Sequence, residues 1–267
     1  MNHTLTRVPE AYLGVWQRRL LTTQEGLHDD STEVYWLQTQ YLHADVRIPV
    51  PTPAVGAATL SACNQEQRQA LSLQAGFAGL TEVNGDTCQW HRLIDFQPTG
   101  GPADIGRMTF ETPDRVIEDG LDGSYHEIWE RLPGSVGIND GLWLKAADGS
   151  ARQGCLLVAG EYFLFAAERP VAQPWGGHLS TALELADPLE QQALLAFELS
   201  FGLIAQGWTI THSTLPGRTG QTLLHSTCDA ISLSCIDDAT LAQLGVYPPE
   251  AGWVSADPPP IVATGGR

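Results

Sequence analysis

The chain has very little positive charge. It contains 14 Lys+Arg against 31 Asp+Glu in 267 residues, a formal net charge of −17, and Lys145 is its single lysine. An acidic surface repels the phosphates of nucleic acids and of anionic membranes, so we expect neither as a partner. With one lysine, catalysis through a lysine Schiff base is also disfavoured.

The sequence also lacks long apolar runs and paired cysteines. It has no stretch of about 18 apolar residues, and its first ten residues are polar, so we expect neither a membrane span nor secretion. The cysteines are odd in number, and no two have Cys-x-x-Cys spacing; they are Cys63, Cys88, Cys155, Cys228 and Cys235. This pattern favours free thiols in a reducing cytoplasm over a disulfide framework or a zinc site.

The common cofactor and catalytic motifs are missing. There is no Gly-x-Gly-x-x-Gly after a strand, no phosphate-binding Gly-x-x-x-x-Gly-Lys-Ser/Thr, no Gly-x-Ser-x-Gly and no His-Glu-x-x-His. His43 and Asp45 have a spacing seen on metal-binding strands, but the sequence indicates no third ligand. We therefore expect no nucleotide or other cofactor and no metal.

A Gly-x-Trp motif occurs twice, half a chain apart. Gly14-Val15-Trp16 opens the first half and Gly141-Leu142-Trp143 opens the second, and each is followed by strand-like runs. Hydrophobic residues make up 43% of the chain and charged residues 17%, which is typical of a folded protein with a substantial core. The repeat predicts two β-rich domains, residues 1–135 and 136–267.

The strand-like runs follow one another closely. In the first half they are residues 33–49, 77–83, 87–96, 106–111 and 124–132, separated by turns rich in Gly, Asn and Asp. In the second half we expect a strand at 155–167, a hairpin from 194–204 and 208–215, and an irregular tail from Pro248. Helix is confined to segments near 61–75, 188–195 and 238–244, each with a capping or stop signal.

Residues 14–132 resemble the lipocalin, or calycin, superfamily. In that superfamily a Gly-x-Trp near the first strand packs against an arginine from a late strand and closes the bottom of the barrel; Trp16 and Arg131 match these positions. The second half has no equally clear closing arginine. The resemblance implies an eight-stranded antiparallel barrel with an internal ligand cavity. The expected fold is mainly β, with two tandem lipocalin-like barrels, or one large pseudo-repeated barrel or sandwich, and a few short helices.

Alternation along residues 33–49 gives two mixed faces, because side chains two apart share a face of a strand. One face carries Tyr35, Leu37, Thr39, Tyr41, His43, Asp45 and Arg47, and the other carries Val34, Trp36, Gln38, Gln40, Leu42, Ala44, Val46 and Ile48. Mixed aromatic and polar faces are typical of a ligand cavity. The alternative is a strand whose exposed face changes sides at a bulge.

Two further runs place charges among aromatic residues. Cys88, Trp90, Arg92, Ile94 and Phe96 alternate on one, and Tyr125, Glu127, Trp129 and Arg131 alternate on the other. A charge inside an apolar row is costly unless it is paired, so we expect Arg92 to pair with Glu127 or Asp45. Such a pair either fixes the packing or recognises an anionic ligand beside an acid/base carboxylate.

Three functions remain open from the sequence. The first is binding of a small, partly apolar molecule in the barrel, the second a cofactor-independent acid/base enzyme, and the third an interaction module without a ligand. The candidate catalytic residues are Glu127, His43 and Asp45; the candidate ligand-binding residues are Arg92, Trp90, Tyr41, Trp36, Trp129 and Arg47. We expect a small molecule as the partner, and a homodimer is the one assembly that we keep open.

Overall fold

Strands dominate both halves of the chain in the computed structural model, which describes residues 6–51, 56–98, 102–171, 177–225, 233–245 and 252–261. The strands of the first half are β1 (Gly14–Thr23), β2 (His28–Asp29), β3 (Glu33–Gln38), β4 (Leu42–Ile48), β5 (Ala75–Asn84), β6 (Thr87–Asp95), β7 (Asp104–Thr112), β8 (Arg115–Gly120) and β9 (Tyr125–Arg131). Those of the second half are β10 (Asn139–Ala146), β11 (Gln153–Ala159), β12 (Tyr162–Ala167), β13 (Glu198–Leu203), β14 (Thr209–Ser213) and β15 (Trp253–Ala256). The helical segments are η1 (Glu10–Tyr12), η2 (Leu60–Ala62), α1 (Gln65–Leu71), α2 (Leu179–Leu185), α3 (Pro188–Leu195), η3 (Leu233–Cys235) and α4 (Asp238–Leu241).

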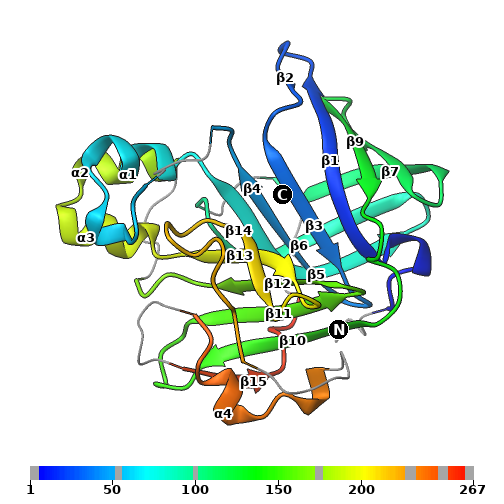
Figure 1. Cartoon of the computed structure of the whole chain (residues 1–267). Helices are drawn as coiled ribbons and strands as arrows, with labels where there is room; N and C mark the ends of the chain where they lie inside the picture. Colours follow the sequence, from blue (N-terminus) through cyan, green and yellow to red (C-terminus); the bar gives the residue numbers. More distant parts are fainter. Residues whose placement is uncertain are drawn as a thin grey trace.

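The first half is a closed, eight-stranded antiparallel barrel. Strands β1, β3, β4, β5, β6, β7, β8 and β9 pair in this order, each antiparallel to the next, and β9 returns to pair with β1. The short β2 adds to β1 beyond the barrel wall. Figure 1 shows this barrel in blue to green above the sheet of the second half. The expected eight-stranded antiparallel barrel is confirmed.

One end of the barrel is closed by Trp16 and Arg131. The two residues are register partners on β1 and β9, and the guanidinium of Arg131 lies 4.4 Å from the indole centroid of Trp16. The indole nitrogen donates to the Tyr12 carbonyl oxygen of η1 at 2.7 Å. Arg131 also donates to the carbonyl oxygens of Ala11 at 2.8 Å and Pro113 at 2.6 Å. The predicted Trp–Arg contact is confirmed.

The run 33–49 is a hairpin and not the single strand that its composition predicts. Strands β3 and β4 are joined at 39–41, where the Thr39 hydroxyl donates to the Leu42 carbonyl oxygen at 2.9 Å. The turn reverses the alternation, so Trp36 on β3 and Asp45 on β4 are cross-strand partners inside the barrel. The mixed faces therefore arise because two strands were taken as one.

The second half forms one six-stranded antiparallel sheet, in the order β14-β13-β12-β11-β10-β15. Within the described residues no pairing joins β14 to β15, so the second closed barrel predicted from the repeat is not found there. The run 155–167 is again a hairpin, β11 and β12, in which both faces are buried. A sheet covered on both faces is not forced to close upon itself.

The second sheet packs on the outside of the barrel. Outward residues of β3, β4 and β5 share one apolar core with inward residues of the sheet and with α2 and α3; they include Leu37, Ala44, Val46, Leu157, Phe201 and Leu183. The other face of the sheet is covered by α4 and neighbouring segments. Figure 1 shows α1, α2 and α3 gathered at one side of the junction.

Helix signals in the sequence mark their elements well. Helices α1 and α3 both begin with a capping box, at Asn64 and Asp187, and α4 lies where the sequence predicts it. Helix α2, which follows His178, is not among the predictions. The tail is not wholly irregular, because β15 pairs with β10 and buries Trp253; residues 246–251 and 262–267 lie outside the described part.

Three cysteines, Cys63, Cys88 and Cys155, are free and buried, whereas Cys228 and the Cys235 side chain lie outside the described part. In the described residues no helix has the length and hydropathy needed to cross a bilayer. The division into domains at 135 stays a prediction.

We predict that Arg131→Ala destabilises the protein by ~3 kcal/mol, because it removes the cation–π contact with Trp16 and the hydrogen bonds to the carbonyl oxygens of Ala11 and Pro113. Urea denaturation measures this change. Arg107→Ala is the control: its side chain is 54% exposed and pairs with Asp86, so a loss of at most about 1 kcal/mol is expected. Equal losses in the two variants would contradict the closing role of Arg131.

Candidate functional site

Charged side chains fill the end of the barrel opposite Trp16 and Arg131. On β4, Asp45 and Arg47 point inward because the alternate residues Ala44 and Val46 belong to the core between the two halves. Acidic and basic residues from β1, β6, β7, β8 and β9 meet them there. We call this part of the interior, together with the loop residues that contact it, the charged end; its ionisable members are Arg18, Asp29, Asp45, Arg47, Arg92, Asp95, Asp104, Glu118, Tyr125 and Glu127.

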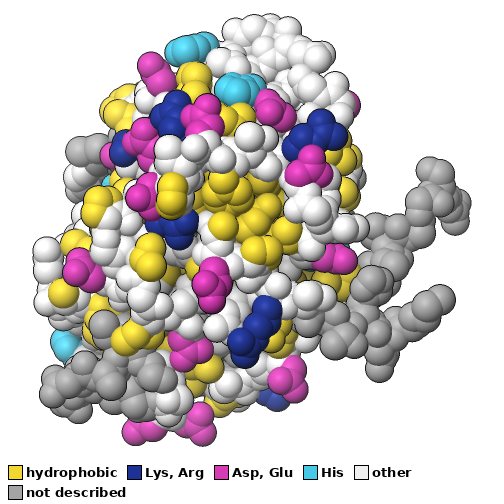
Figure 2. Space-filling model, turned by 90° about the vertical axis from the view of Figure 1, so that its right-hand side faces the viewer, with side chains coloured by type: hydrophobic (Ala, Val, Ile, Leu, Met, Phe, Trp, Pro, Cys, Tyr) yellow, Lys and Arg dark blue, Asp and Glu magenta, His cyan; other side chains and the backbone are white. Residues whose placement is uncertain are grey.

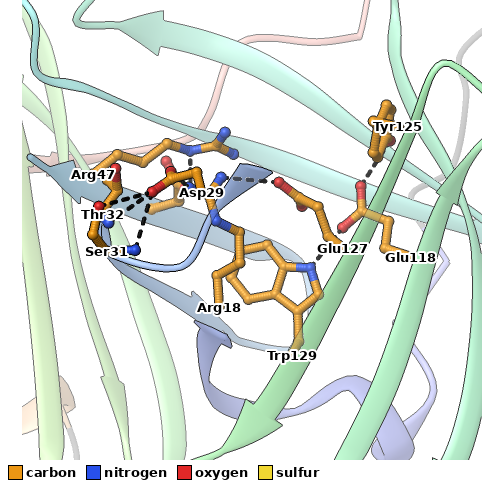
Figure 3. A network of polar contacts seen from close by, with 10 residues as sticks. Arg18, Asp29, Ser31, Thr32, Arg47, Glu118, Tyr125, Glu127 and Trp129 are labelled. Atoms are coloured by element: carbon orange, nitrogen blue, oxygen red, sulfur yellow. Dashed lines mark hydrogen bonds and ion pairs between the residues drawn. The ribbon is translucent and has the colours of Figure 1, made fainter. Parts of the chain in front are cut away.

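Arg18 connects β1 with two acidic partners. Its guanidinium donates to Glu127 Oε1 at 3.0 Å and to Asp29 Oδ2 at 2.6 Å, and its side chain is 4% exposed. Asp29 also accepts from the backbone nitrogens of Ser31 and Thr32 (Figure 3). Burial opposes ionisation of Asp29, but these hydrogen bonds and Arg18 outweigh it and lower its pKa to about 2.

Glu118 lies directly opposite Glu127 across β8 and β9. Its two oxygens accept from the Tyr125 hydroxyl at 2.8 Å and the Trp129 indole nitrogen at 3.1 Å (Figure 3). Burial, together with the charges of Glu127 and Asp104, raises the pKa of Glu118 well above its usual range. Burial also raises the pKa of Glu127, although nearby arginines oppose the shift.

Gly106 makes room for the Glu118 side chain. A Cβ atom at position 106 would lie 2.7 Å from Glu118 Cγ and 2.9 Å from Glu118 Oε1. Any larger residue at position 106 would therefore push this carboxyl group out of its place between Tyr125 and Trp129. The position of the Glu118 carboxyl group thus requires a glycine at position 106.

Arg92 and Arg47 lie toward the mouth of the barrel. Arg92 pairs with Asp95 and, at 3.5 Å, with Asp104, and its guanidinium lies 4.0 Å from the ring centroid of Phe77. Arg47 donates to Asp45 Oδ2 at 2.8 Å, and its guanidinium lies 5.3 Å from the same ring. Burial raises the pKa of Asp95 to about 6 despite the arginine beside it.

The expected partners of Arg92 are wrong. Glu127 pairs with Arg18, and Asp45 pairs with Arg47. The reason is a register shift between β5 and β6, at Ala78/Gly79, which changes the face on which later β6 residues lie. Trp90 thus faces the barrel interior, whereas Ile94 and Phe96 pack into the core between the halves.

A chain of hydrogen bonds fixes the protonation of His43. The Gln38 amide oxygen accepts from the Trp36 indole at 3.1 Å and from the Thr81 hydroxyl at 2.8 Å. The Thr81 oxygen must then accept from His43 Nδ1, 3.0 Å away, so the proton lies on Nδ1. Among the described residues Nε2 has no partner, and burial lowers the His43 pKa to about 3. His43 is therefore a neutral imidazole with a bare Nε2.

The space within the charged end is small. It is about 20 Å³, room for about one water molecule, and is lined by Trp36, Asp45, Arg47, Phe77, Trp90, Asp104, Glu118 and Trp129. A larger hollow of about 530 Å³ lies outside the barrel, between the 39–42 turn, β10 and the residues after β15. Any ligand of the barrel larger than water needs a side chain at the mouth to move.

Most predicted site residues do come together. Trp36, Asp45, Arg47, Trp90 and Trp129 line the internal space, Glu127 and His43 lie beside it, and Arg92 is near its mouth. Tyr41 does not join them, since it lies in the turn, lines the outer hollow and accepts a hydrogen bond from Arg7.

Several residues of the charged end were missed by sequence reasoning. They are Arg18, Asp29, Phe77, Asp95, Asp104 and Glu118. The run Val116-Ile117-Glu118 carried a usable signal, because alternation on a strand there places Val116 and Glu118 on one face. The sequence around Arg18 carried no such signal, because the position of Arg18 depends on an irregularity in the pairing of β1 with β9.

No protein-family model and no curated protein sequence matches the chain. Two solved structures are similar. A lipocalin-like protein from Bacteroides uniformis aligns with 10% identity and a TM-score of 0.32, over 46% of this chain and 99% of that protein. An uncharacterized protein from Saccharomyces cerevisiae aligns with 12% identity and a TM-score of 0.53, over 92% of this chain and 98% of that protein. The second similarity shows a shared fold across both halves.

We predict that Asp95 makes the protein less stable as the pH rises from 4 to 6. The pKa of Asp95 is 3.8 in an ordinary environment and about 6 in the fold, so the folded state binds the proton more tightly than the unfolded state does. The stability gained from this proton is present below pH 4 and is lost as the pH rises through the pKa of the folded state. The shift corresponds to a loss of about 3 kcal/mol across this window.

Urea denaturation of wild type and Asp95→Asn at several pH values tests this. The unfolding free energy of the variant should change less between pH 4 and 6 than that of wild type. Parallel curves for the two proteins would show that Asp95 does not titrate in this window.

Proposed function

We propose that this protein binds a small, partly apolar molecule in the charged end of its barrel. The observation that carries the proposal is the lining of one enclosed space by four aromatic side chains and three carboxyl groups. Aromatic walls with a few convergent polar groups are what small-molecule sites use for affinity and orientation.

The charges themselves support a binding role. Replacing buried ion pairs by apolar residues of similar volume is often neutral or stabilising, so a barrel needs no such network in order to fold. Here the ion pairs are nonetheless several. Arg18 on β1 pairs with Glu127 on β9 (Figure 3). Arg92 on β6 pairs with Asp104 on β7, and Arg47 pairs with Asp45 on β4. We infer that these groups are kept for a ligand.

The route of entry is past Arg47. Its side chain is 29% exposed, whereas that of its partner Asp45 is 2% exposed. A long side chain held at one end by a single acid can turn toward water, and this movement enlarges the space without moving the backbone. The three free, buried cysteines support a reducing compartment, and we place the function in the cytoplasm.

On the face drawn in Figure 2, the described residues form no charge patch of one sign that would favour an interaction module with a charged partner. Figure 2 shows one face on which acidic and basic side chains are scattered singly around a central group of hydrophobic side chains. On this face the charges do not gather by sign.

We predict that small molecules that bind will perturb the indole N–H resonances of Trp36, Trp90 and Trp129 in a fragment screen by NMR. Those of Trp208 and Trp253, in the far core of the second half, are internal controls and should not shift. Native mass spectrometry of the purified protein provides a second test, for a ligand retained from the cell.

Shifts confined to Trp143 would contradict the proposal, because Trp143 lines the outer hollow. Shifts at no tryptophan, together with no retained mass, would favour an interaction module.

Acid/base catalysis in the same space is a second candidate, favoured by the facing pair Glu118 and Glu127 with raised pKa values. We predict that Glu118→Gln still folds, because the amide matches the carboxyl group in size and lacks the charge that burial disfavours. If the protein turns over a molecule found in the screen, this variant should bind that molecule and not convert it. Conversion at the wild-type rate would remove Glu118 from the chemistry.

A further inference from the structure

The space inside the barrel has more acid than base around it. Its lining contains Asp45, Asp104 and Glu118 but only one basic residue, Arg47. The two other arginines of the charged end each have two acidic partners: Arg18 binds Glu127 and Asp29, and Arg92 binds Asp95 and Asp104. If Arg47 turned outward, the lining would hold carboxyl groups and no cation.

The rings of the lining are placed to attract positive charge. Phe77 already has two guanidinium groups near its ring, that of Arg92 at 4.0 Å and that of Arg47 at 5.3 Å. Trp36 meets Trp90 edge to face at 5.4 Å and Trp129 at 5.8 Å, so the three indoles enclose one side of the space. Aromatic faces bind ammonium and guanidinium groups, most strongly where water is excluded.

Arg47 thus acts as the resident cation of this space. Its guanidinium touches the most buried acid of the lining, Asp45, and lies near Phe77, while part of its side chain reaches solvent. A ligand that displaces it must supply a positive charge, since otherwise Asp45 is left buried and unpaired. A neutral or anionic ligand cannot make this replacement.

We propose that the ligand of the charged end is a small organic cation, an amine or a guanidine, which takes the place of the Arg47 guanidinium between Phe77 and the carboxylates. The proposal rests on the binding function proposed above and adds the chemical class of the ligand. Burial and neighbouring acids raise the pKa values of Glu118 and Asp104, and a bound cation would favour the ionised form of both groups.

The test uses three probes of similar shape and different charge: 2-phenylethylamine, 2-phenylethanol and phenylacetate. Isothermal titration calorimetry at neutral pH should show the amine binding wild type at least tenfold tighter than the alcohol, about 1.4 kcal/mol. Phenylacetate should bind more weakly than either. Equal or tighter binding of the alcohol or the acid would overturn the cation inference while leaving the binding function in place.

Arg47→Ala tests the displacement step. Because the variant has no resident cation to expel, the amine should bind it at least tenfold tighter than it binds wild type, and the preference over the alcohol should increase. Arg107→Ala, on the outer surface, should bind the amine as wild type does. If Arg47→Ala does not fold, Arg47→Met serves the same purpose, since it removes the charge and keeps an apolar stem.

Asp104→Asn locates the bound amine. Asp104 lies at the mouth, and its side chain is 25% exposed, so the variant should fold and bind the amine at least fivefold more weakly. Glu82→Gln is the matched control, because Glu82 pairs with His91 and is 42% exposed. Unchanged affinity in Asp104→Asn, or no binding of the amine to wild type or to Arg47→Ala, would overturn the proposal.

Discussion

Strand β4 is buried on both faces, and the rest of the site depends on this constraint. Its outward residues Leu42, Ala44 and Val46 pack into the core shared with the second sheet, and His43 and Asp45 face the barrel interior with almost no exposure. A polar group on such a strand cannot turn to water, so it must find a partner inside the barrel. The second sheet thus fixes where the polar residues of β4 point.

The polar groups inside the barrel find their partners in two separate ways. Toward the closed end, His43 Nδ1 is satisfied by a neutral hydrogen bond to Thr81, which donates in turn to Gln38. Toward the mouth, acids are satisfied by arginines that reach in from different strands. The indoles of Trp36, Trp90 and Trp129 lie in the apolar core of the barrel next to both systems. Neutral hydrogen bonds thus lie toward the closed end of the barrel, and ion pairs lie toward its mouth.

Sequence patterns predicted the elements whose signals are local. The alternation from Tyr125 to Arg131 lies on a single regular strand, so its inward residues were found correctly, as was the contact of Trp16 with Arg131. The capping box at Asp187 marks the start of α3 in the same way. In each case one strand or one turn of helix carries the whole signal.

Patterns failed where the chain changes direction or register inside a run of strand-like residues. The 39–41 turn, Thr-Gln-Tyr, contains no Gly, Pro, Asn or Asp and is held by side-chain hydrogen bonds of Thr39 and Gln38. The shift at Ala78/Gly79 moved Ile94 and Phe96 to the outside. Its signal in the sequence is Gly79, a glycine inside a strand, where a Cβ atom would collide with the His91 carbonyl oxygen. The second half was predicted to be a barrel because the Gly-x-Trp motif recurs there, whereas the sequence does not show what packs on the two faces of its strands.

The pairing of β15 with β10 bears on the order in which the chain folds during synthesis. The barrel closes through β1 and β9, so all of its pairings lie within the residues up to Arg131. The second sheet gains its last strand only when Trp253 to Ala256 return to β10, over a hundred residues later along the chain. Long-range pairings form slowly, and domains synthesised first generally fold first. A nascent chain can therefore hold a closed barrel whose outer apolar wall, on β3 to β5, still lacks its cover, and this wall is the part of the molecule most in need of protection from aggregation.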